Sequence, residues 1–182
     1  MSEILKSFSP QDDDTVTAFV YGVYERDGRR GSRGGVGVWF GENHTLNISE
    51  SLESCYSKSN AEIKAAARAI EHAKAAGIKK LCIKTDSEFL VKSASHWSKA
   101  GCTLEAGGSW AQNQEDYKVL YDAITDSGME IRWHYVPGHS GIEGNQKADA
   151  LARLGAQMSA NDAGDATLSE NLKSKENYSR YY

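Results

Sequence analysis

Three short segments rich in β-branched and aromatic residues follow one another near the start of the chain, and only glycine-containing turns separate them. Segments joined by such short turns pair as antiparallel neighbours, because a tight turn brings the chain back alongside itself. The pattern therefore predicts a three-stranded antiparallel meander, which restricts the chain to folds built on a sheet. The three segments are residues 16–24, 35–40 and 45–51.

The rest of the chain alternates helical and extended patterns. Residues 60–76 are rich in alanine, repeat apolar side chains at helical spacing and end at Gly77. Strands that enter a sheet through helical crossovers run parallel to a neighbour, so we expect an α/β domain with a mixed five-stranded sheet flanked by helices. The later elements are expected as a strand at 81–85, a helix capped by Ser87 and reaching about residue 99, a helix with Tyr117, Leu120, Tyr121 and Ile124 on one face, a strand at 131–135, and a helix to about residue 155.

The length of 182 residues suits a single domain, which we expect at residues 15–156. Residues 1–14 are polar and acidic and residues 157–182 are rich in Ser, Asn, Asp and Lys, so we expect two poorly ordered tails, through which a protein partner could dock. No apolar run is long enough to cross a membrane, and the first residues lack a signal core. These features predict a monomer in the cytoplasm or nucleus.

Charge and cysteine content narrow the kinds of site to expect. The formal net charge of −4 gives no general attraction to nucleic acid, so a polyanion would have to bind a local patch. The cysteines Cys55, Cys82 and Cys102 are odd in number and widely spaced, which is atypical of zinc sites and of disulfide frameworks. We expect them to be buried, reduced thiols.

Four residues lie where a sheet-based site would collect side chains. Asp86 directly follows a buried strand, and sites in α/β proteins form at such strand ends. Asp149 borders the apolar side of its helix, where a carboxylate costs free energy unless something uses it. Glu62 is expected in the first turn of the alanine-rich helix, and His139 in a glycine-rich loop. Taken singly, Glu62 and Asp86 are better explained as acids at helix N-termini, and His139 as a turn residue without a task.

The segments around these residues form a much more specific combination. They are residues 136–141 followed by Gly144-Asn145, Ala148-Asp149 and Leu151-Ala152, then Asn60-Ala61-Glu62-Ile63, Thr85-Asp86-Ser87, and the glycine-rich residues 35–41. This combination resembles the motifs of the ribonuclease H type 1 family over roughly residues 15–156, with the same order of elements. The resemblance implies a ribonuclease H-like fold.

The resemblance also implies a chemistry. Enzymes of this family cut the RNA strand of RNA–DNA hybrids with two Mg²⁺ ions held by four carboxylates, and paired hard cations of this kind need oxygen ligands. By motif match, Glu62, Asp86 and Asp149 would be three of the metal ligands. His139 would be the loop residue that helps move protons or release product.

The fourth carboxylate is where this sequence departs from the family. The family has an Asp before a Gly in the middle of the first strand, and here Tyr21 precedes Gly22. A phenol offers one neutral oxygen in place of a carboxylate and brings a bulky ring. Asp14 lies about 23 Å away along an extended strand, and Glu25 and Asp27 at least about 13 Å away, so no neighbouring acid is expected to substitute.

The residues expected to hold substrate match the family only in part. Before Glu62, the family usually has a polar segment that binds phosphate and RNA hydroxyls, which here corresponds to Ser57, Lys58 and Asn60. Trp97 and Lys99 remain of the Trp- and Lys-rich segment that many members carry. The other basic group is a solvated turn or a nucleic-acid contact, and it comprises Arg26, Arg29, Arg30 and Arg33.

Three hypotheses follow: an active or weakly active ribonuclease H with Mg²⁺ as cofactor, a catalytically dead module that binds RNA–DNA hybrid or another duplex, or a protein-interaction domain that keeps only the fold. Three clustered carboxylates without a metal repel one another, and no structural need for them is apparent in the sequence. Their presence therefore favours a retained nucleic-acid function with impaired hydrolysis.

Overall fold

The computed structural model describes residues 14–27, 31–53, 55, 57–100 and 114–158. Within them a five-stranded sheet has the order β3-β2-β1-β4-β5, antiparallel between β1, β2 and β3 and parallel between β1, β4 and β5. The expected mixed sheet is therefore confirmed. The elements are β1 (Thr15–Asp27), β2 (Gly31–Trp39), β3 (Ile48–Leu52), α1 (Lys58–Ala75), β4 (Lys80–Thr85), α2 (Glu88–Ala100), α3 (Gln114–Ser127), β5 (Glu130–Tyr135) and α4 (Glu143–Gln157).

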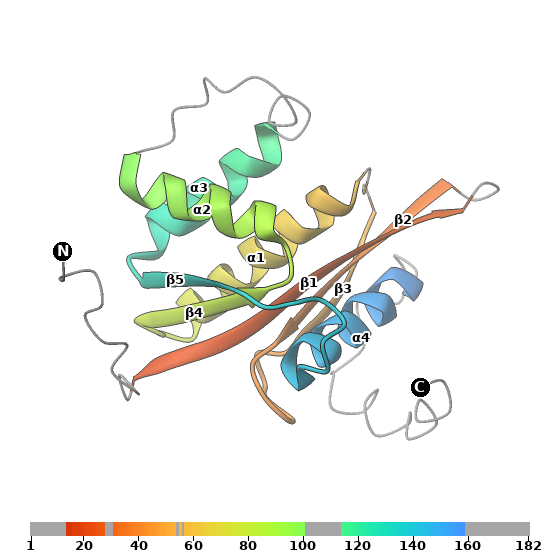
Figure 1. The fold of residues 1–182 in the computed structure, drawn as a ribbon, viewed down its shortest axis with the longest axis horizontal. Helices are drawn as coiled ribbons and strands as arrows, with labels where there is room; N and C mark the ends of the chain where they lie inside the picture. Colours follow the sequence, from red (N-terminus) through yellow and green to blue (C-terminus); the bar gives the residue numbers. More distant parts are fainter. Residues whose placement is uncertain (1–13, 28–30, 54, 56, 101–113, 159–182) are drawn as a thin grey trace, which may run out of the picture.

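The helices cover the sheet unequally. Helices α1, α2 and α3 gather on one side, whereas α4 lies alone on the other, against β1, β2 and β3 (Figure 1). The larger apolar core lies beneath α1 and includes Val20, Val36, Ile70 and Ile83. A smaller core lies beneath α4 and consists of Tyr21, Val23, Ala148, Ala152 and Ala156, with Phe19 and Trp39 packed against it. Tyr21 is thus part of a packed apolar cluster.

The third strand begins later than predicted. We expected it at residues 45–51, and it spans Ile48–Leu52. The side chain of Asn47 accepts a hydrogen bond from the Phe40 backbone N–H at 2.7 Å and donates one to the Gly41 carbonyl at 2.8 Å. These bonds hold the preceding residues in a turn, because a side-chain amide can satisfy backbone groups that a strand would otherwise pair.

The cysteines only partly fit their prediction. Cys55 and Cys82 are free thiols, and burial raises the pKa of both. Cys55 is buried, but Cys82 is partly exposed. Leu81 and Ile83 on either side of it enter the core beneath α1, so Cys82 faces the opposite side of the sheet, where α4 packs on β1, β2 and β3. Cys102 lies outside the described residues, as do nearly all residues of the two expected tails. In the described part of the chain, no helix has the length and apolar character needed to span a membrane.

Candidate active site

The first turn of α1 is set by Ser57. The Ser57 hydroxyl accepts a hydrogen bond from the Asn60 backbone N–H at 3.1 Å, which caps the helix and makes Lys58 its first residue. Glu62 therefore lies in the second turn, and its expected place in the first turn is wrong. A carboxylate so far inside the helix gains little from the helix dipole, which acts within the first turn. The structural explanation that the sequence allowed for Glu62 is correspondingly weaker.

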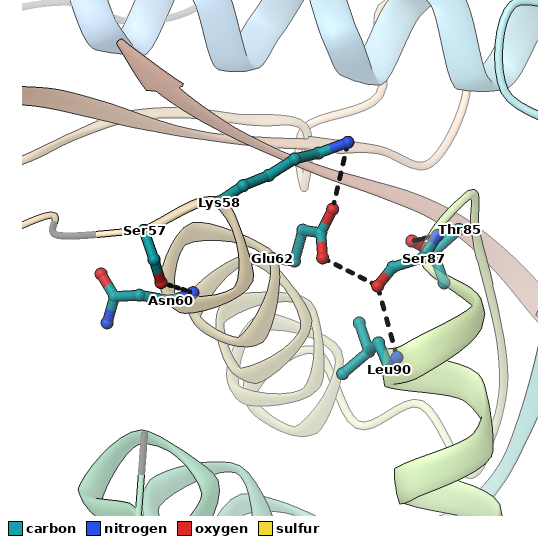
Figure 2. Close-up of polar contacts among 7 residues, drawn as sticks. All are labelled: Ser57, Lys58, Asn60, Glu62, Thr85, Ser87 and Leu90. Carbon is teal, nitrogen blue, oxygen red and sulfur yellow. Dashed lines mark hydrogen bonds and ion pairs between the residues drawn. The ribbon is translucent and has the colours of Figure 1, made fainter. Parts of the chain in front are cut away.

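Glu62 is a buried carboxylate with two protein partners (Figure 2). Its side chain is 10% exposed; one oxygen accepts a hydrogen bond from the Ser87 hydroxyl at 2.7 Å, and the other lies 3.4 Å from the Lys58 ammonium. Burial raises the pKa of Glu62, and the contacts with Ser87 and Lys58 partly oppose that rise. Ser87 also caps α2 as predicted, since its oxygen accepts the Leu90 backbone N–H at 3.3 Å. One serine thus ties Glu62 to the start of α2.

Tyr21 lies among the predicted carboxylates. Only 7% of the residue is exposed. Burial, followed by the negative charges of Asp149 and Asp86, raises the pKa of Tyr21 to about 12, so its phenol is neutral at physiological pH. The Lys58 ammonium lies 5.7 Å from the centre of the Tyr21 ring.

The first strand offers no replacement acid near Tyr21. Strand β1 pairs with β2 residue by residue from Phe19 to Asp27 without a bulge. Glu25 and Asp27 therefore stay farther along the strand at its regular rise. Glu25 is also exposed.

Asp149 lies on the side of α4 that faces the sheet. Its side chain is 13% exposed, and one of its oxygens accepts a hydrogen bond from Arg153 Nε at 2.8 Å. The pairing explains how a carboxylate is accommodated next to the small core around Tyr21, since a partly buried charge requires a counter-charge.

Asp86 lies at the end of β4, against the loop that carries His139. A side chain at Gly138 would meet the Asp86 carboxylate, so only glycine fits there without displacing one of them. His139 itself is exposed and has a backbone φ of 54°, a left-handed conformation that costs energy in a residue with a side chain. The strained, solvent-facing loop is thus positioned directly beside one of the predicted carboxylates.

The residues expected to hold substrate differ in how accessible they are. Ser57 and Lys58 lie at the start of α1, and the side chain of Lys58 is 60% exposed. Asn60 does not fit its predicted role, because it is fully buried and its amide donates to Asp116 on α3 at 2.7 Å, which turns it away from the surface. The side chains of Trp97 and Lys99 lie outside the described part of the structure, as do Arg29 and Arg30.

The carboxylates do not form a ready metal site. Among the described residues, no group of three or more His, Cys, Asp or Glu side chains is arranged to hold a metal ion. Glu62 is paired with Lys58 and Asp149 with Arg153, so two of the three predicted ligands already have a cation from the protein. Both acids therefore have a charged partner within the protein, which was not predicted from the sequence.

The spacing of these ion pairs is visible in the sequence. Lys58 and Glu62, like Asp149 and Arg153, are separated by one helical turn, the spacing at which opposite charges meet on a helix. Such spacings are common on solvated helix faces. Burial of the acid, which only the packed structure reveals, separates these two pairs from ordinary surface pairs.

Comparison with known proteins identifies the family. The family model of RNase H matches residues 13–157. Ribonuclease H1 of Homo sapiens is 41% identical over 150 residues, a stretch that covers 80% of this chain and 51% of the human protein. The chain spans about half the length of the mammalian relatives that it matches.

Solved structures support the same fold. LC9-RNase H1, described as a type 1 RNase H with the type 2 active-site motif, aligns with a TM-score of 0.64 at 19% identity and covers 94% of this chain and 86% of its own. LC11-RNase H1, solved in complex with RNA/DNA hybrid, aligns with a TM-score of 0.54 at 18% identity and covers 78% of this chain and 96% of its own. At such identities the structural likeness speaks for the fold alone.

Proposed function

This chain belongs to the RNase H family, and we propose that it binds RNA–DNA hybrids but hydrolyses their RNA strand slowly or not at all. Hybrid as the substrate class is supported by the names of its relatives and by LC11-RNase H1, whose structure contains an RNA/DNA hybrid. The motif residues Glu62, Asp86, Asp149 and His139 support a nucleic-acid site that descends from a hydrolytic one.

The proposal of impaired turnover rests on one observation: a buried, neutral Tyr21 lies among the three predicted metal ligands. By the family resemblance, this position would hold the aspartate that contacts both metal ions. A neutral phenol is a poor replacement for a bridging carboxylate, because hard divalent cations bind charged oxygens most strongly.

The residues present do not fit a pair of Mg²⁺ ions, although the family generally uses Mg²⁺. Lys58 and Arg153 bring positive charge to two of the carboxylates, and the Tyr21 ring packs where a fourth carboxylate would be needed. No step through a metal is therefore assigned to the wild-type chain.

The direct test compares hydrolysis by the wild-type protein and by Tyr21→Asp. With a labelled RNA–DNA hybrid and millimolar Mg²⁺, we expect little cleavage by the wild type. We expect Tyr21→Asp to raise the rate by at least about tenfold, equivalent to about 1.4 kcal/mol of activation free energy. Gel analysis of the labelled RNA strand measures the rate.

The matched control is Tyr21→Phe, which keeps the buried ring and should stay inactive. Circular dichroism of each variant separates loss of the fold from loss of activity, because Tyr21→Asp removes an aromatic ring from the small core. Efficient cleavage by the wild type would contradict the proposal. Absence of hybrid binding at low salt by a folded wild type would favour a protein-interaction domain instead.

A further inference from the structure

Lys58 occupies a place that the helix itself disfavours. It is the first residue of α1, where the positive end of the helix dipole repels a cation. It also precedes Glu62 by one turn, which is the weaker order for an acid–base pair on a helix. Local helix energetics therefore do not favour a lysine here, so any stabilisation that it provides has to come from what its ammonium contacts.

The Lys58 ammonium lies between the two features that distinguish this site. It is 3.4 Å from the buried carboxylate of Glu62 and 5.7 Å from the centre of the Tyr21 ring. Figure 2 shows the extended lysine side chain reaching across to the oxygen of Glu62 that Ser87 does not bind. A cation near an aromatic face is attracted to it, so both neighbours favour the ammonium in this position.

A second pair in the same protein shows why the burial of Glu62 matters. Lys118 and Asp122 on α3 have the same order and the same one-turn spacing, but their side chains are 68% and 48% exposed. Water solvates both of these charges whether or not they are paired. Glu62, at 10% exposed, cannot rely on water to the same extent and needs a counter-charge.

We propose that Lys58 is the resident cation of this site: its ammonium supplies, beside Glu62, the positive charge that a divalent metal ion would otherwise supply. The inference rests on the proposed function, which treats Glu62 as a former metal ligand. Binding of divalent cations is then opposed both by the absence of a carboxylate at Tyr21 and by the lysine already in place.

The test is metal rescue of Lys58→Met, a change that removes the charge but keeps an unbranched side chain over the Tyr21 ring. Thermal unfolding is followed by circular dichroism in EDTA, in millimolar Mg²⁺ and in millimolar Mn²⁺. The wild-type midpoint should be the same in all three solutions. The Lys58→Met midpoint should fall by roughly 5 °C in EDTA, and either metal ion should restore most of the loss.

Two further variants make the result specific. Lys118→Met removes the exposed pair of identical spacing, and its midpoint should not respond to metal. Lys58→Met/Glu62→Gln removes both charges of the Lys58–Glu62 pair, so it should regain the midpoint in EDTA and lose the metal response. If Lys58→Met does not fold in EDTA, we expect it to fold when Mn²⁺ is added. We then also expect the double variant to fold in EDTA.

The proposal is overturned if Lys58→Met is as stable as the wild type in EDTA. It is also overturned if neither metal ion raises the Lys58→Met midpoint, or if the metal ions stabilise the wild type to the same extent. Absence of hybrid binding would contradict the proposed function but would leave these metal responses unchanged. The two failures are therefore distinguishable.

Discussion

At the scale of single residues, Tyr21 fills the small core beneath α4, and its phenol is uncharged. Its ring packs with Val23, Ala148 and Ala152, while its hydroxyl stays protonated among Asp149, Asp86 and Glu62. The same residue thus contributes packing free energy and, being neutral, adds no negative charge to a crowded acidic site.

The raised pKa of Tyr21 predicts a loss of stability in alkaline solution. Because the folded protein holds this proton more tightly than the unfolded chain, the contribution is fully present below pH 10 and is lost as pH rises from about 10 to about 12. Tyr21→Phe should lack this component. Urea unfolding at several alkaline pH values measures the stability, and absorbance of tyrosinate measures the titration. Identical pH profiles for the two proteins would contradict the assignment.

At the scale of elements, the position of α4 depends on two glycines of β2. A Cβ at Gly37 would collide with the backbone of α4 at Ala148 and Ala152, and a Cβ at Gly35 with Ala152 and Ala156. The helix therefore packs directly onto the strand backbone, and this close approach places Asp149 beside Tyr21.

Gly37→Ala should consequently destabilise the protein by about 1–3 kcal/mol or more, because neither backbone can move freely. Gly41→Ala is the matched control: a Cβ there has only ordinary contact with His44, at 3.9 Å, and the expected change is within about 0.5 kcal/mol. Urea denaturation gives both values. Equal effects of the two substitutions would show that α4 is not held by this contact.

At the scale of the whole molecule, the net charge of −4 means that any affinity for a polyanion comes from a small region. The salt dependence of binding reports the number of phosphate contacts in that region. Each contact steepens the fall of log affinity with log salt concentration by close to one unit. Arg33 is a described member of the basic turn group, whereas the Lys58 ammonium is paired with Glu62.

Hybrid affinity, measured by fluorescence anisotropy, should therefore fall as salt is raised. Arg33→Ala should lower the slope by about one unit if the basic turn contacts phosphate. Lys58→Met should leave the slope nearly unchanged. A drop of a full unit in Lys58→Met would instead assign Lys58 to phosphate binding, as the sequence first suggested.

The sequence alone determined the order of the elements, the mixed sheet and the family. Alternating patterns, glycine-containing turns and the alanine-rich stripe depend on local spacing, which the chain carries without reference to its fold. Element ends were less predictable. The start of β3 depends on the side chain of Asn47, and the first turn of α1 on the cap at Ser57.

Tertiary structure alone decided the chemistry of the site. Glu62 comes from α1, Tyr21 from β1, Asp86 from the end of β4 and Asp149 from α4, so their mutual charges act only once the sheet and helices are packed. Burial is what turns the Lys58–Glu62 spacing from a surface pair into a buried charge with its own cation. Burial is a property of the assembled protein, because it depends on every element that excludes water from the carboxylate.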